Sequence, residues 1–275
     1  RKFVNPTTGV SEAIFSPTAL ADDYVVFVGA RDLPGSELGR GGPGFVSAVL
    51  SRNGAFTTEE KMQLDTMKTE FEGAVIKRGE TTGFGRWGGA ISFDRPTNWH
   101  FNHMTDPMGG QIDFFSVALH ELAHALGLGA SKEWDDLVSG TTFTGTNAKA
   151  AHTPTDQTDQ PPLVSTTDTG HWSQMIATSP VFDSPATLQT PLMVPSLGSN
   201  TRRKLTRLDA AALVDLGWEI NLPISGASSL VSGDAPSVSS GFAALSASVV
   251  PEPAGVVLVV MGAMFAVAFR SRARG

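Results

Sequence analysis

Two short runs of β-branched and aromatic residues predict strands in the first hundred positions of the chain. Residues 24–29 (YVVFVG) are suited to a buried strand, and residues 89–94 (GAISFD) predict a second strand that ends before Pro96. Between them, residues 34–44 are rich in glycine and proline, which indicates a loop. The N-terminal region is therefore expected to contribute a sheet.

Helical periodicity appears on both sides of a long irregular stretch. Residues 58–73 predict an amphipathic helix with a threonine cap at position 57 or 58. The apolar positions of this helix are Met62, Leu64, Met67 and Phe71. Residues 206–216 (TRLDAAALVDL) predict a last helix that ends at Gly217. Residues 129–191 have many turn residues and little periodicity, so we expect loops with few regular elements there.

The segment between Asp113 and Gly127 has apolar residues around almost its whole circumference. Such a pattern predicts a helix that is buried on most sides, with Asp113 as its N-cap. His120 and His124 interrupt it four positions apart, so both imidazoles project from one face and can bind the same cation. Glu121 lies beside them, within reach of a metal-bound water. Zinc lowers the pKa of such a water to about 7, so the motif HELAH predicts metal-assisted hydrolysis of an amide bond.

Composition narrows the chemistry of such a site. The chain has 41% hydrophobic and 17% charged residues with a net charge of -7, which is typical of a mildly acidic globular protein and not of a nucleic-acid-binding one. Cysteine is absent, which excludes disulfides and thiolate ligands within this chain. A zinc site here must therefore use histidine and carboxylate ligands.

The segment HELAHALGLG resembles the active-site helix of metzincin metallopeptidases, in which Gly127 follows the HExxH motif. Metzincins usually carry a third ligand three residues after that glycine, and the residue here is Ala130, which cannot bind zinc. Later segments resemble those of leishmanolysin-like metzincins in the same order. They are GHWSQM at residues 170–175, PLMVP at residues 191–195 and a closing helix within residues 205–218. In that branch an insertion separates the zinc helix from the third histidine.

This resemblance implies that His171 is the third zinc ligand and that Met193 lies beneath the metal in a Met-turn. It also implies an α+β fold. An N-terminal subdomain over residues 1–128 would hold a twisted sheet and the zinc helix, and a loop-rich C-terminal subdomain over residues 129–220 would close the cleft. The implied activity is that of a zinc-dependent endopeptidase with Glu121 as general base, acting on peptides or proteins.

Alternatives remain for the third ligand and for the function. His152 is closer to the helix in sequence than His171. However, only His171 is followed directly by Trp172 and then by PLMVP and the closing helix in the order described above. A glutamate ligand would have to be Glu133, the only glutamate between Glu121 and Glu219, and it lies close to the helix. For the function, the alternative is a non-catalytic exported surface protein that retains a zinc site for stability or binding.

Three further features receive an interpretation. His100 and His103 are interpreted as surface histidines on a loop and not as a second metal site. Residues 89–94 resemble the edge strand along which metzincins align an extended substrate, so peptide binding by strand addition is a hypothesis. Some metzincins place a tyrosine after the Met-turn, but the one tyrosine of this chain is Tyr24. Oxyanion stabilisation would then depend on zinc and on backbone donors.

The C-terminal residues predict a linker and a membrane segment. Residues 221–250 are rich in serine, glycine and alanine, which suits a flexible linker. Residues 254–269 form an uninterrupted apolar run; as a helix they would span about 24 Å, slightly less than the roughly 30 Å hydrocarbon core. The arginines after this run would remain cytoplasmic by the positive-inside rule, which places the folded part on the other side of the membrane.

The order of VPEP, apolar run and arginine cluster within residues 250–275 resembles the PEP-CTERM sorting signal of Gram-negative bacteria. The resemblance implies export, transient anchoring in the inner membrane with the catalytic domain on the periplasmic side, and cleavage by an exosortase-like enzyme that allows release to the cell surface. An uncleaved single-span anchor is the alternative. No secretory signal precedes Phe3, so we interpret the start as truncated or processed.

Overall fold

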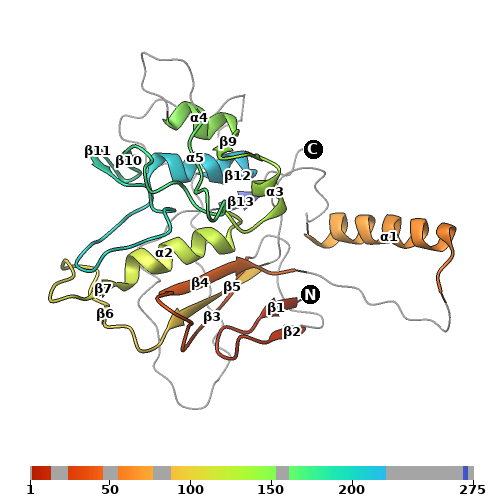
Figure 1. Cartoon of the computed structure of the whole chain (residues 1–275), viewed down its shortest axis with the longest axis horizontal. Helices are drawn as coiled ribbons and strands as arrows, with labels where there is room; N and C mark the ends of the chain where they lie inside the picture. Colours follow the sequence, from red (N-terminus) through yellow and green to blue (C-terminus); the bar gives the residue numbers. More distant parts are fainter. Residues whose placement is uncertain are drawn as a thin grey trace, which may run out of the picture.

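The computed structural model describes residues 2–13, 24–45, 55–76, 88–152, 161–220 and 269–271. Within these residues the fold is α+β, with five helices and several small sheets. The central helix α2 (Phe114–Ala125) lies between a three-stranded sheet on one side and a loop-rich region with α3, α4 and α5 on the other (Figure 1). This helix therefore has two packing faces.

The three-stranded sheet consists of β3 (Val25–Arg31), β5 (Gly88–Asp94) and β4 (Gly39–Pro43) in that spatial order. β3 pairs with β5 in parallel and β4 pairs with β5 antiparallel. Both strands predicted from the sequence are present, but the loop predicted for residues 34–44 is wrong because it contains β4. The edge position predicted for residues 89–94 is also wrong, since β5 is central and β4 forms the edge.

The predicted burial of the first strand is wrong as well. β3 is an outer strand of this sheet, and the Val28 side chain is 52% exposed. The hairpin of β1 (Lys2–Val4) and β2 (Ser11–Ala13) contributes Phe3, which stacks on Phe27 with ring centroids 4.1 Å apart. The N-terminal residues therefore cover part of the sheet.

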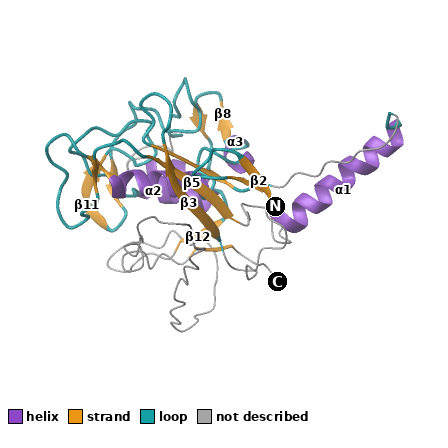
Figure 2. Cartoon of the chain, turned by 90° about the horizontal axis from the view of Figure 1, so that it is seen from below, coloured by secondary structure: helices purple, strands orange, loops and turns teal. Residues whose placement is uncertain are grey.

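The helix α1 (Thr58–Ile76) begins with a reciprocal cap. The Thr57 hydroxyl accepts a hydrogen bond from the Glu60 backbone N–H, and the Glu60 carboxylate accepts one from the Thr57 N–H, as in a capping box. The helix projects to one side of the molecule (Figures 1 and 2). Met62 and Met67 are 66% and 60% exposed, so the predicted apolar face is not buried at these two positions.

The helix α2 confirms the prediction most closely. The Asp113 carboxylate accepts a hydrogen bond from the Ser116 N–H, which satisfies a free donor of the first turn. One face packs on the sheet, where Val117 and Ala118 join a cluster with Ile91 and other residues of β5. The opposite face contributes to the larger core of the C-terminal region. The helix is therefore buried on both sides, as its composition predicts.

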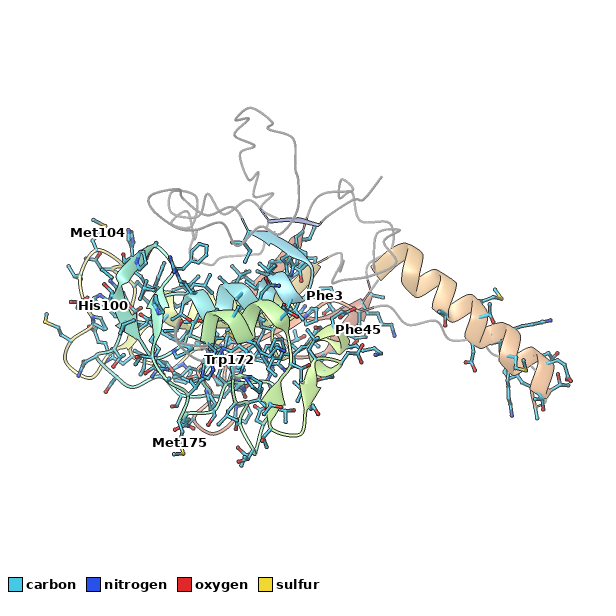
Figure 3. All side chains as sticks on the ribbon, turned by 90° about the horizontal axis from the view of Figure 1, so that it is seen from above. Phe3, Phe45, His100, Met104, Trp172 and Met175 are labelled. Atoms are coloured by element: carbon cyan, nitrogen blue, oxygen red, sulfur yellow. The ribbon has the colours of Figure 1, made fainter. Side chains whose placement is uncertain are left out.

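Aromatic side chains form the centre of the C-terminal core. Trp134 lies 4.4 Å from Phe143 and 5.0 Å from Trp172 between ring centroids. All three are fully buried, and Trp172 lies in the dense interior of Figure 3, whereas Met104 and Met175 lie at the periphery. The core of this region is thus built from a few large residues.

The C-terminal region consists of loops with short helices and strands, as predicted for residues 129–191. They include α3 (Lys132–Asp135), β8 (Val138–Ser139), β9 (Thr142–Phe143), α4 (Thr146–His152), β10 (Ser179–Val181) and β11 (Ser184–Gln189). The predicted last helix is α5 (Arg207–Asp215), which is followed by β12 (Trp218–Ile220). A further short pair, β6 (Trp99–His100) and β7 (Ile112–Asp113), precedes α2.

The predicted linker and almost all of the predicted membrane segment lie outside the described residues. The exception is Phe269, the last residue of that segment, which belongs to β13 (Phe269–Ser271) and pairs with Ile220 of β12. Among the residues that the structure describes, no helix is long and apolar enough to cross a membrane.

Candidate metal centre

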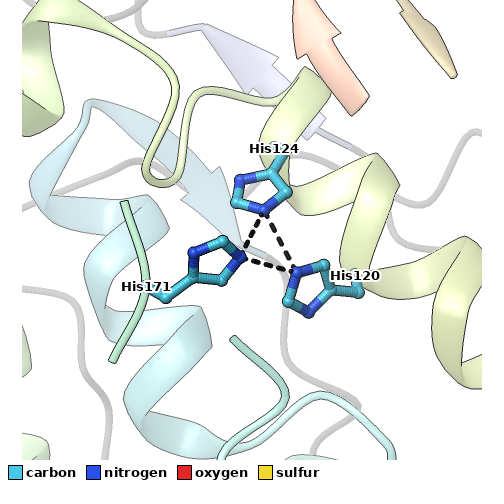
Figure 4. Close-up of side chains that lie close together, drawn as sticks. All are labelled: His120, His124 and His171. Carbon is cyan, nitrogen blue, oxygen red and sulfur yellow. Dashed lines mark hydrogen bonds between the residues drawn. The ribbon is translucent and has the colours of Figure 1, made fainter. Parts of the chain in front are cut away.

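Three histidine side chains converge beside α2 (Figure 4). His120 and His124 project from the same face of the helix, and His171 enters from the loop before Trp172. Each pair of Nε2 atoms is 3.1 Å apart. Three nitrogens that bind zinc tetrahedrally at about 2.0–2.1 Å lie about 3.3 Å from one another, so the donor set fits this ion.

The other ring nitrogen of each histidine has its own partner. The Nδ1 atoms lie 2.7–2.9 Å from acceptor oxygens. These acceptors are the backbone oxygens of Leu192, for His120, and Leu128, for His124, and the carboxylate of Asp168, for His171. With a proton on each Nδ1, the Nε2 lone pairs face one another, which is the arrangement that a shared cation requires.

Burial favours the neutral form of the two helix histidines. It lowers the pKa of His124 to about 4 and holds the pKa of His120 well below its ordinary value, and the neighbouring imidazoles act in the same direction. Metal binding requires an unprotonated imidazole nitrogen. His120 and His124 are therefore in the form that can bind a metal.

Two glycines bring the His171 loop against the end of α2. Gly129 has a positive φ of 67°, and a Cβ there would lie 1.8 Å from the Gly170 backbone oxygen. Only a residue without a side chain permits this contact. His171 lines the same cleft as Ala130, which has no ligand atom. The loop thus brings a third histidine to His120 and His124.

Glu121 faces the opposite wall of the site. Its side chain is enclosed by β4, where a Cβ at Gly39 would lie 2.6 Å from the Glu121 Cγ. Burial raises the pKa of Glu121 to about 8, and the nearby Glu37 adds to the shift; a hydrogen bond from the Gly41 backbone and the charge of Arg40 oppose it. This group can therefore both gain and release a proton near neutral pH.

The three histidines and Glu121 line one cleft of about 720 Å³. One wall is β4 with the preceding residues 36–38, and the other is α2 with residues 194–197. The ligand atoms and the carboxylate are thus accessible to the same bound molecule.

The family model of the matrixins (Peptidase_M10) matches residues 56–160 of this chain. The match supports a metzincin-type metallopeptidase. Matrixins bind zinc, and the matched residues include His120, Glu121 and His124. Searches of curated proteins and of solved structures gave no significant match.

The segment predicted as a Met-turn contacts the histidine cluster through its backbone. Met193 is fully buried, and its backbone oxygen accepts a hydrogen bond of 2.9 Å from the Trp172 N–H. The preceding residue, Leu192, supplies the oxygen that accepts from His120. The turn therefore accepts a hydrogen bond from His120 and contacts Trp172, the residue after His171.

A buried carboxylate that the sequence interpretation missed fixes this turn. Asp209 of α5 is fully buried and accepts five hydrogen bonds. The donors are the backbone N–H groups of Leu192, Met193 and Thr206, the Thr206 hydroxyl and the Trp172 indole. Its spacing from Thr206 marks a capping box, but the bonds to the turn depend on tertiary contacts.

Asp168 was missed as well. It precedes His171 by three residues, and its carboxylate is 2.8 Å from the His171 Nδ1. Partial burial raises the pKa of Asp168, but a hydrogen bond from the Gly170 N–H and the adjacent His171 lower it by more, so the group is an anion. A carboxylate that orients a metal-binding histidine is a common feature of zinc sites, and the segment DTGH is the available signal.

Other candidates lie elsewhere. The metal-ligating group among the described residues does not include His152, which ends α4. His100 is bonded to Gln111 and Thr105 instead. The Tyr24 hydroxyl donates to the Ala125 backbone oxygen and does not line the cleft.

Proposed function

We propose that this chain is a zinc-dependent endopeptidase in which His120, His124 and His171 hold the metal. The observation that supports this proposal most is that three Nε2 atoms lie 3.1 Å apart in the same cleft as the buried Glu121. Three protein ligands with an open position are the usual arrangement of a catalytic zinc site, whereas a structural site usually has four. A cleft of about 720 Å³ leaves room for an extended peptide.

Each residue then has a separate task. Zinc, when bound, polarises a peptide carbonyl and makes a water molecule more acidic. In its ionised form, Glu121 takes the proton from the attacking water and passes it to the departing amine; burial, which raises its pKa to about 8, makes this carboxylate a stronger proton acceptor. Asp168 and the Leu192 backbone oxygen keep the His171 and His120 rings in orientation. Backbone donors complete the stabilisation of the oxyanion, since Tyr24 lies outside the cleft.

The first experiment separates a peptidase from a non-catalytic zinc protein. Purified protein is incubated with a mixed peptide library, with and without a chelator, alongside Glu121→Ala and the exposed control Glu12→Ala. We expect chelator-sensitive cleavage by the wild type and by Glu12→Ala, and a loss of at least about 100-fold in Glu121→Ala with zinc still bound. Cleavage by zinc-loaded Glu121→Ala at the wild-type rate would refute the proposed base, and a zinc-loaded wild type without activity would favour the non-catalytic alternative.

A leishmanolysin-like arrangement is the finer part of the proposal. It is supported by the order of His171, Met193 and α5, and by the contact between Gly129 and Gly170 that brings the distant loop to the helix. We expect zinc content to fall sharply in His171→Ala and to stay near one ion per chain in His152→Ala, as measured by atomic absorption. The reverse result would transfer the ligand role to His152.

We also propose that the chain is exported and held, at least transiently, in the inner membrane of a Gram-negative bacterium, with the catalytic domain in the periplasm. The support is the sequence pattern of residues 250–275, which resembles a PEP-CTERM signal with an exosortase-like partner. Protease added to intact spheroplasts should digest the domain that contains residues 1–220. Complete protection from the protease would contradict this topology.

A further inference from the structure

A positively charged side chain lies in the cleft on the side away from β4. Arg203 lines this part of the cleft together with the apolar residues Ile112, Val117 and Leu197. These three apolar side chains belong to one packed cluster, so this part of the cleft has apolar walls. A guanidinium between apolar walls is a local feature that calls for an anionic partner.

The backbone of Arg203 is fixed to the helix that carries the histidines. Its N–H donates a hydrogen bond of 2.6 Å to the Ser116 hydroxyl, and Ser116 precedes His120 by four residues on the same helix face. On the other side, the Arg203 Nη1 donates to the Ser196 backbone oxygen at 2.5 Å. Arg203 therefore links the two parts of one wall of the cleft, α2 and residues 194–197, near His120, whose pKa its charge helps to lower.

Arg203 also lacks the ion pair that its counterpart in the cleft has. Arg40 forms a bidentate pair with Glu37 at 2.6 Å, whereas none of the salt bridges in the described part of the chain involves Arg203. Burial lowers the pKa of Arg203, and the one carboxylate whose charge opposes this is Asp209, whose oxygens already accept five hydrogen bonds. The guanidinium thus keeps donors for a ligand.

We propose that Arg203 selects peptides with an aspartate or glutamate side chain close to the cleaved bond. The proposal rests on the peptidase function proposed above and names its substrate class. A carboxylate that enters between the apolar walls would accept two parallel hydrogen bonds from the guanidinium, in a partly desolvated place where such a pair is stronger than in water. The net charge of -7 does not attract acidic peptides over long range, so the selection is local to Arg203.

The test compares matched peptides and matched variants of the full chain. Peptides found by the library experiment are made with Glu or Gln at each position next to the cleaved bond, and kcat/KM is measured for each. At one position we expect the wild type to prefer Glu by about 10- to 100-fold. Arg203→Gln should lose this preference while it still cleaves the Gln peptide, and Lys204→Gln, which removes the neighbouring exposed cation, should keep it. An equal preference in wild type and Arg203→Gln would overturn the proposal.

A binding measurement separates this proposal from the peptidase function. Anisotropy of labelled Glu and Gln peptides is recorded with zinc-loaded Glu121→Ala, with and without the added change Arg203→Gln. A Glu preference that disappears with Arg203→Gln supports the role of Arg203 even if no peptide is hydrolysed, whereas hydrolysis without any such preference refutes Arg203 and leaves the peptidase function intact. Arg203→Glu gives an independent check, since it should shift the preference to peptides with Lys at the same position.

Discussion

On its sheet side, α2 lies against β4, a strand whose glycines bring one backbone directly onto another. On its other side, it faces loops that are fixed by the buried carboxylate of Asp209 and the partly buried carboxylate of Asp168. A Cβ at Gly41 would lie 2.1 Å from the Glu121 backbone oxygen, while Asp209 accepts two hydrogen bonds from the turn, two from Thr206 at the start of the closing helix and one from the Trp172 indole. The proposed base is thus placed by the absence of side chains alone, whereas the third histidine depends on polar contacts in addition to the contact between Gly129 and Gly170.

This difference predicts how each side of α2 responds to substitution. Contacts through glycine are short range and tolerate no added atom, but they leave no charged group behind when they are disturbed. A buried carboxylate with several donors fails differently, because its removal leaves each donor without a partner. Substitutions on the loop side should therefore cost more stability, and those on the sheet side should affect the base before the fold.

The largest effect is expected for Asp209→Ala. Loss of this acceptor leaves the buried N–H groups of Leu192 and Met193 and the Trp172 indole without a partner, and we expect a loss of about 3–5 kcal/mol in the free energy of unfolding. Denaturant unfolding monitored by tryptophan fluorescence measures it. The control Asp183→Ala removes an exposed carboxylate paired with Lys204 and should change stability by less than about 0.5 kcal/mol. Similar values for the two variants would show that Asp209 does not organise the turn.

A smaller effect is expected on the sheet side from Gly41→Ala. The added methyl group would overlap the Glu121 backbone, so β4 or α2 must shift, at a cost of about 1–3 kcal/mol. Peptide hydrolysis should fall while zinc content stays near one ion per chain. The neighbouring change Gly42→Ala is a close control, since a Cβ there meets nothing within 4 Å. If both variants retain full activity, the close contact of β4 is not required to position Glu121.

The same difference explains which parts of the molecule the sequence predicted. The helix around His120 and the last helix carry their own caps, Asp113 and Thr206, within three residues of the groups that they satisfy, so local pattern is sufficient. β4 was not predicted because GRGGP has no alternation of apolar side chains. Its glycines are needed for contact with α2, which is distant in sequence. The central place of residues 89–94 also depends on partners that no local pattern names.

The candidate site follows the same rule. His120, Glu121 and His124 form one motif on one helix, and their spacing alone defines their common face. His171 was reached through the order of later segments and not through physical chemistry of its own. Asp209 has the spacing of an ordinary capping residue, and nothing local distinguishes it from one that holds a turn 17 residues earlier in the chain.

Asp168→Asn should have the smallest effect on folding, but it should clearly weaken zinc binding. The amide oxygen can still accept from the His171 Nδ1, but the negative charge that strengthens this bond is lost, so zinc affinity should fall by about 10- to 100-fold. The Asp168 side chain is 58% exposed, and stability of the metal-free protein should change by less than about 0.5 kcal/mol. Competition with a chelating indicator measures the affinity, and denaturant unfolding of the metal-free protein measures the stability. Asp136→Asn is the control, because it also removes an exposed carboxylate paired with a basic residue, Lys132, but lies outside the cleft. If Asp168→Asn and Asp136→Asn bind zinc equally well, the glycine contact between Gly129 and Gly170 alone orients His171, and the loop side would then depend on backbone packing as the sheet side does.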